Sequence, residues 1–199
     1  MAVWRFFQGL CNQFFPQASQ DEPAARDETP KQEAPAHDES LCQLIRQGGV
    51  RRVVEIGVGS GQRAARMIHE ALRQHAPVEI HYVGIDSFEG GGKASLKDVY
   101  QLLRPTGARL RLIPGDALSG LRQVANDLPD TDLLVISSDQ TDASLQDAWA
   151  YMPRMLHAES QVFREEFDPE TKSLSLRSIS VAEIDALADQ VWKRRRLAA

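Results

Sequence analysis

The sequence has few cysteines and no long apolar run. Cys11 and Cys42 are its two cysteines, and neither lies in a CxxC spacing or beside a histidine cluster, which excludes a disulfide-rich scaffold and offers no zinc site. The apolar runs are far shorter than the ~18 residues of a membrane-spanning helix. The opening MAVWRFFQGLCNQFFP interrupts its apolar residues with Gln and Asn, unlike a secretory signal. We therefore expect a cytoplasmic protein.

The chain also lacks an excess of positive charge. It carries 23 Lys and Arg against 28 Asp and Glu, and residues 40–199 are nearly balanced, with 21 acids and 20 bases. A near-neutral body does not offer the broad basic surface that attracts nucleic acid. The one basic run, Lys193 to Arg196, is also favoured by the dipole at the end of a helix. Nucleic acid is therefore not an expected partner.

Two segments precede the main body of the chain. In residues 1–15, apolar side chains recur at spacings of three and four, at Val3, Phe7, Leu10 and Phe14. This spacing predicts a short amphipathic helix that contacts a partner protein, a membrane surface or its own domain. Residues 16–39 contain four prolines and no apolar periodicity, which predicts a disordered linker. We expect residues 40–199 to form one domain and residues 1–39 to be dispensable for its folding.

Strand-like and helix-like segments alternate in the body. Strands are expected at 50–56, 80–85, 109–113, 132–137 and 160–167, and helices at 60–74, 95–104, 117–127, 144–156 and 182–197. Parallel neighbours need crossovers of this length, so the pattern predicts a doubly wound, mostly parallel Rossmann-like α/β sheet with helices on both faces. Leu174 and Leu176 alternate with polar residues after a turn, which predicts a shortened antiparallel edge at the C-terminal end.

Three glycines follow the first expected strand, in VVEIGVGSGQRAARMI. Gly57, Gly59 and Gly61 lie where a doubly wound sheet binds its ligand, and glycine permits both a sharp turn and a close approach to that ligand. Gln62 stands where the dinucleotide pattern GxGxxG has its third glycine, which argues against NAD. With Glu55 just before the first glycine, the segment resembles motif I, (D/E)xGxGxG, of class I S-adenosylmethionine-dependent methyltransferases. The fourth strand and the helix after it, DLLVISSDQTDASLQDAWAYMPRMLHAES, resemble the same stretch of their small O-methyltransferase-like members.

The resemblance covers about residues 50–167 and implies a site for S-adenosylmethionine. Asp86 ends the second strand, in YVGIDSFEG, where the family's acid accepts hydrogen bonds from both ribose hydroxyls. Asp116 ends the third strand, in IPGDAL, where the family places a polar group near the adenine amino group. Asp116 could equally cap the next helix. The other cofactor positions that the resemblance implies are Ser87, Phe88, Ala117 and Ser138.

The sequence departs from the metal-dependent members of this family after the fourth strand. The segment Ser137-Ser138-Asp139-Gln140 contains one acid, whereas a divalent cation needs several converging oxygens, so we expect no metal. Gln140 stands where related members carry a histidine base. Asp139 and Glu166 are the remaining candidates for a general base.

Two functions remain open. The first is methyl transfer from S-adenosylmethionine to a small-molecule acceptor of unknown identity, because an activated donor needs little beyond positioning when the acceptor is reactive. The second is a non-catalytic adenosine-ligand-binding or scaffold protein with the same fold. Gln140 favours the second function, and the glycine turn favours ligand binding in both.

Overall fold

The computed structural model describes residues 36–75, 79–88 and 94–198. The chain divides into two units, Met1–Glu33 and Ala34–Ala199, and all described residues belong to the second. The helix expected at residues 1–15 and most of the expected linker lie outside the described residues. None of the helices in the described ranges is long and apolar enough to cross a membrane.

A six-stranded sheet forms the centre of the fold, with the strand order β3-β2-β1-β4-β5-β6. The strands are β1 (Arg52–Ile56), β2 (His81–Asp86), β3 (Arg109–Pro114), β4 (Thr131–Ile136), β5 (Leu156–Asp168) and β6 (Ser173–Ile179). The first five are parallel, and β6 pairs antiparallel with β5. The strand order reverses direction at β1 and β4, which is the doubly wound topology. The predicted fold class is confirmed, including its antiparallel edge.

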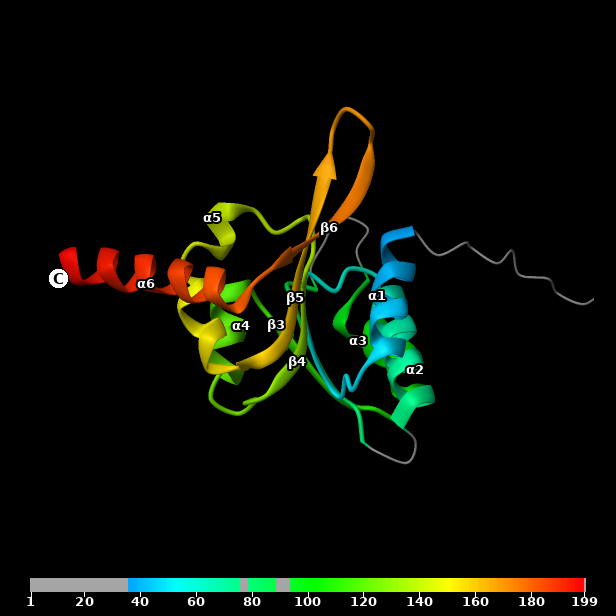
Figure 1. Ribbon diagram of the computed structural model, residues 1–199. Helices are drawn as coiled ribbons and strands as arrows, with labels where there is room; N and C mark the ends of the chain where they lie inside the picture. The colour runs from blue at the N-terminus through cyan, green and yellow to red at the C-terminus, as the bar shows by residue number, and fades with distance from the viewer. Residues whose placement is uncertain (1–35, 76–78, 89–93, 199) are drawn as a thin grey trace, which may run out of the picture. The chain divides into compact units, whose positions relative to one another are not determined.

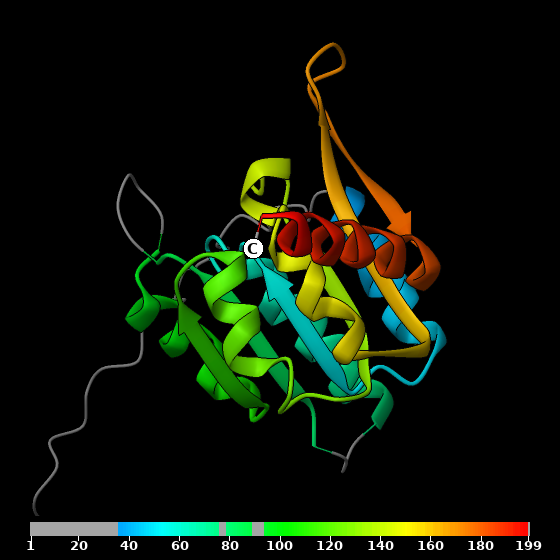
Figure 2. The ribbon, with the colours of Figure 1, turned by 90° about the vertical axis from the view of Figure 1, so that its left-hand side faces the viewer.

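Helices cover both faces of this sheet (Figure 1). One face carries α1 (Ala36–Gln47), α2 (Gln62–His75) and α3 (Leu96–Leu103), which continues into the 3-10 turn η1 (Arg104–Thr106). The other face, which is turned toward the viewer in Figure 2, carries α4 (Ala117–Val124), α5 (Asp142–Leu145), the 3-10 helix η2 (Ala148–Arg154) and α6 (Val181–Leu197).

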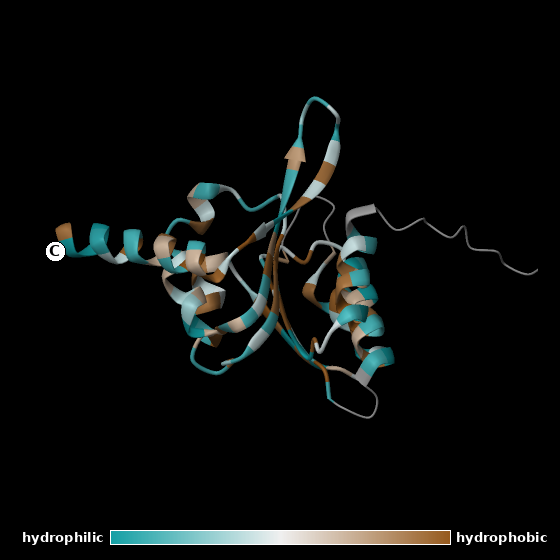
Figure 3. Cartoon of the chain, in the orientation of Figure 1, coloured by the Kyte–Doolittle hydropathy of each residue, from teal (hydrophilic) through white to brown (hydrophobic). Residues whose placement is uncertain are grey.

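Each face of the sheet has its own apolar core. Successive strand residues point to opposite faces, so Val53 packs under α2 while Val54 packs on the side of α4 and α6. Apolar residues accordingly gather on the strands and on the inner sides of the helices (Figure 3). The carboxyl ends of β1, β2 and β4 therefore meet at one edge of the sheet, held between two packed layers.

Two segments differ from the sequence-based expectation. The helix expected at 144–156 is divided into the short α5 and the 3-10 helix η2, which contains Pro153; proline has no N–H to donate within an α-helix. Helix α1 begins at Ala36, inside the range expected to be linker. Its Leu41 and Ile45 are fully buried, so the domain starts before residue 40.

A chain that begins at Ala34 is expected to be more stable than one that begins at Ser40. Asp38 is only 3% exposed and forms an ion pair with Arg66 of α2. Removing Asp38 leaves a partly buried guanidinium without this carboxylate, at a cost of about 1 to 3 kcal/mol. Thermal unfolding of the two proteins measures the difference, and equal melting temperatures would show that residues 34–39 add nothing to the domain.

Candidate functional site

The glycine turn between β1 and α2 has three left-handed residues with different surroundings. The φ angles of Gly57, Gly59 and Gly61 are 86°, 59° and 79°. A Cβ on Gly57 would lie 2.6 Å from Asp139 Oδ1, and one on Gly61 would press against α3. A Cβ on Gly59 would meet no atom within 4 Å. The first and third glycines therefore permit close packing, whereas the second faces open space that a ligand could enter.

Asp86, the last residue of β2, is bonded directly to this turn. Its Oδ2 accepts a hydrogen bond from the Gly59 N–H at 2.9 Å, and its Oδ1 accepts one from the Phe88 N–H at 3.1 Å. The side chain of Ser87 is exposed, and Phe88 is largely buried with a φ of 51°. The Ser87 hydroxyl also donates to Asp86 Oδ1, at 3.4 Å. A carboxylate has about four lone-pair positions, so Asp86 keeps one acceptor position beyond these three bonds while fixing the position of Gly59.

A buried polar cluster supports the turn from the α2 side of the sheet. Glu55 is fully buried, and its carboxylate accepts hydrogen bonds from Arg63 Nε at 2.7 Å and from the Tyr82 hydroxyl. Arg63 also donates to the Gly57 carbonyl at 3.2 Å and forms an ion pair with Glu165 of β5. Burial raises the pKa of Glu55, although the neighbouring Arg63 and Tyr82 oppose this shift. Glu55 thus fixes the position of Arg63, and Arg63 in turn holds the glycine turn through the Gly57 carbonyl.

Glu165 lies beside the glycine turn although no sequence pattern indicates it, whereas its neighbour Glu166 lies away from the turn. Glu165 is 3% exposed and accepts a hydrogen bond from the Ser138 N–H at 3.2 Å. Glu166 is exposed on the opposite face of β5, 3.7 Å from Arg177. Because strand side chains alternate between faces, only one of these adjacent acids can reach the glycine turn. The structure therefore does not bring Glu166, a candidate base in the sequence, to the glycine turn.

Asp139 does lie at the glycine turn. Its carboxylate stands over Gly57 and accepts a hydrogen bond from Gln140 Nε2 at 2.9 Å. The Gln140 carbonyl in turn accepts from Arg164 of β5 at 3.2 Å. The loop after β4 thus places one exposed acid beside the first glycine. In residues 36–75, 79–88 and 94–198, no three His, Cys, Asp or Glu side chains are grouped to hold a metal ion.

The two residues expected near an adenine ring have structural roles. Asp116 is the N-cap of α4, where its side chain accepts a hydrogen bond from the Ser119 N–H at 2.7 Å. This bond lowers the pKa of Asp116. Ala117, the first residue of α4, is 1% exposed and packs in the core between α4 and the sheet. Asp116 therefore caps the helix, which is the second of the two roles expected for it. The Gly115 N–H donates to the Asp86 carbonyl at 2.9 Å, and this bond keeps the turn before α4 beside the site.

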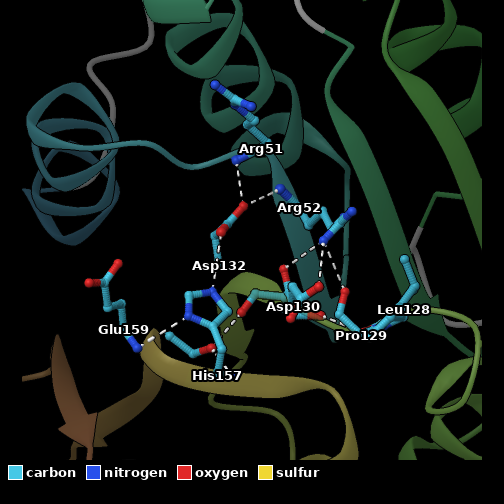
Figure 4. A network of polar contacts seen from close by, with 10 residues as sticks. Arg51, Arg52, Leu128, Pro129, Asp130, Asp132, His157 and Glu159 are labelled. Carbon is cyan, nitrogen blue, oxygen red and sulfur yellow. Dashed lines mark hydrogen bonds and ion pairs between the residues drawn. The ribbon is translucent and has the colours of Figure 1, made fainter.

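A second polar network lies at the opposite, amino edge of the sheet (Figure 4). Asp132 Oδ2 accepts hydrogen bonds from the N–H groups of Arg51 and Arg52 at 2.7 and 2.8 Å. Asp132 Oδ1 lies 3.3 Å from Nε2 of His157, whose Nδ1 accepts from the Glu159 N–H at 3.2 Å. These bonds connect the starts of β1, β4 and β5, so the network stabilises strand pairing away from the glycine turn.

Solved structures match this fold, although no family model and no curated protein matches the sequence. A putative O-methyltransferase from Klebsiella pneumoniae has a TM-score of 0.54 and 18% identity, covering 83% of this chain and 70% of that chain. The O-methyltransferase TomG from Streptomyces achromogenes, solved in complex with SAM, has a TM-score of 0.52 and 14% identity, covering 79% and 66%. Cofactor-bound Rv0187 from MTB has a TM-score of 0.51 and 20% identity, covering 83% and 70%. This chain thus has the fold of S-adenosylmethionine-dependent methyltransferases.

Proposed function

We propose that this chain binds S-adenosylmethionine at the carboxyl edge of its sheet and transfers the methyl group to a small-molecule acceptor without a metal. The observation that carries the proposal is the pairing of Asp86 with Gly59. A nearly buried carboxylate fixes a glycine whose missing side chain leaves open space. Solved O-methyltransferases with this fold, one of them bound to SAM, support the same choice of ligand.

The residues of the turn fit such a cofactor. Asp86 has about four lone-pair positions, of which Gly59, Phe88 and Ser87 use three, so accepting both ribose hydroxyls requires the ligand to displace the long Ser87 hydroxyl bond at 3.4 Å. Gly59 lets the backbone approach without a Cβ. When bound, S-adenosylmethionine supplies a methyl group already activated by the positive sulfonium. The chain then has to exclude water and hold the acceptor in line, which can lower a barrier by about 7 to 11 kcal/mol.

In this proposal, Asp139 takes a proton from the acceptor. It is exposed at the end of β4, beside the first glycine of the turn. The Gln140 amide donates a hydrogen bond to Asp139 and does not act as a base at neutral pH. It therefore orients the carboxylate, and the carboxylate alone would accept the proton. The role of Asp139 is testable, because Asp139→Asn should lower turnover while leaving cofactor affinity unchanged.

The alternative is a protein that binds the same ligand without transferring its methyl group. The amide of Gln140, in place of a stronger base, is the observation that favours it. The two functions differ in one readout. A methyltransferase incubated with S-adenosylmethionine and a panel of small hydroxyl and thiol acceptors produces S-adenosylhomocysteine, whereas a binding protein returns the cofactor unchanged.

Calorimetry with S-adenosylmethionine and S-adenosylhomocysteine tests the site itself. Asp86→Ala is expected to weaken binding of both ligands by about 1.5 to 3 kcal/mol for each charge-assisted hydrogen bond lost, or roughly tenfold to a hundredfold. Asp127→Ala is the matched control, because this exposed acid pairs with Arg111 outside the site. Equal affinities of parent and Asp86→Ala would refute the assignment, and a parent that binds neither ligand would refute the proposed function.

A further inference from the structure

The two edges of the sheet are protected to different degrees. An edge strand presents unpaired N–H and C=O groups, and charged residues or proline usually prevent another strand from adding there. On β3 these are Arg109, Arg111 and Pro114, all exposed. On β6, within the sequence SLSLRSI, Arg177 is the one such residue. The β6 edge is therefore open to pairing over most of its length.

The end of the β5–β6 hairpin extends beyond the rest of the sheet. Strand β4 pairs with β5 only as far as Arg164, so residues 165–168 and 173–176 pair only with each other. Both ribbon views show this part of the hairpin projecting past the other elements (Figures 1 and 2). A two-stranded ribbon alone is marginally stable in water, and further strands stabilise it.

One face of this projecting ribbon is apolar. Phe167 is paired with Leu174, and Leu176 follows on the same face. Phe167 is 56% exposed, and the two leucines line a groove between the ribbon and Leu44 of α1. In the described part of the chain, no strand pairs with the outer edge of β6. The ribbon thus combines an open backbone edge with partly exposed apolar side chains.

We propose that β6 pairs antiparallel with β6 of a second copy of this chain, around a two-fold axis at Ser175. This register places Leu174 opposite the partner's Leu176, and Leu176 opposite the partner's Leu174. Arg177 then faces the partner's Ser173, so no like charges meet. A register centred on Arg177 would oppose two guanidinium groups, and one centred on either leucine would keep only one leucine pair.

This pairing is closed and self-complementary. A two-fold interface uses the same residues on both copies, so it ends at a dimer. It joins two marginal ribbons into one four-stranded ribbon and satisfies the open edge of each β6. The apolar face of the ribbon then continues across the axis, where the four leucines meet between the two Phe167 side chains.

Light scattering coupled to gel filtration of the full chain tests the proposal with two double variants. The parent is expected to have twice the mass of one chain. Leu174→Lys/Leu176→Lys places like charges opposite each other and should raise the dimer dissociation constant by about tenfold or more. Leu174→Glu/Leu176→Lys places Glu opposite Lys in the proposed register and should restore the dimer.

The charge-reversed variant also controls for folding, because both variants carry Lys beside Glu165 and should have the same circular dichroism spectrum. A monomeric parent would overturn the proposal, as would a dimer that persists with two lysines. Only the register centred on Ser175 places Glu opposite Lys, because registers centred on Leu174 or Leu176 bring like charges together in both variants. A Glu/Lys variant that does not dimerise would therefore overturn the register and the proposal with it.

Discussion

Replacing Arg63 by alanine is expected to destabilise the domain by about 3 to 5 kcal/mol, the range for a buried ion pair that loses one partner. The guanidinium pairs with two buried carboxylates, Glu55 and Glu165, and donates to the Gly57 carbonyl. Without it, both acids remain buried and the first glycine loses a hydrogen bond. Urea unfolding of the parent and of Arg63→Ala measures the loss.

The pH dependence of this loss has a defined sign. Burial raises the pKa of Glu55 above 4.5 in the folded chain, so its contribution to stability is present below the unfolded pKa and is lost as pH rises through the folded pKa. Arg63 opposes that rise, and Arg63→Ala should therefore lose more stability toward neutral pH than toward pH 4.5. A stability difference that is independent of pH would contradict this origin of the effect.

The control for Arg63→Ala lies on the same helix. Arg73 is 76% exposed at its side chain and is 3.6 Å from Glu70. Arg73→Ala should change the free energy of unfolding by less than about 0.5 kcal/mol, as surface substitutions usually do. Comparable losses from the two substitutions would show that α2 is sensitive to any charge removal and that the buried cluster has no special role.

Gly59→Val is expected to abolish cofactor binding and to reduce stability only moderately. The site has open space for the new side chain, so the loss of folding stability comes from backbone strain alone. An L-residue in the left-handed region costs about 1 to 2 kcal/mol, and a β-branched residue costs somewhat more. The two methyl groups would then occupy the space through which the ligand is proposed to approach. Calorimetry with S-adenosylhomocysteine at a temperature well below the unfolding transition measures the effect on binding.

Gly107→Val is the matched variant for backbone strain. Gly107 also has a positive φ, 78°, and a Cβ there would meet no atom within 4 Å. It lies in the turn before β3, at the amino edge of the sheet. Both variants should lose similar stability, but only Gly59→Val should lose the ligand. Normal binding by Gly59→Val would place the cofactor elsewhere.

The sequence predicted the framework of this fold because its signals there are local. The β-branched runs indicated the parallel strands, and the GxGxG spacing located the turn that the structure places beside Asp86. Boundaries and helix types were less accurate where a single residue decides them, as at Pro153. Helix α1 was not among the expected helices, because a proline-rich, acidic segment leads directly into it.

The buried cluster could not be predicted from local patterns. Arg63 lies on a helix whose periodicity concerns apolar residues, and Glu165 lies on a strand far away in the sequence. Their contact depends on which face of β5 turns toward α2. The sequence alone does not show whether Glu165 or Glu166 lies on that face. Knowing that Phe163 packs on the α2 side would have identified Glu165, because residues two apart on a strand share a face.

The alternation along β5 also limits how this chain can change in length. Inserting or deleting one residue between Val162 and Glu165 would turn Glu165 outward and bring Arg164 or Glu166 toward Arg63. The turn at 169–172 lies beyond the last β5–β6 pair, Asp168 with Ser173, and carries no such constraint. Insertions at this end of the molecule are therefore expected at that turn, whereas β5 itself should not tolerate changes of length.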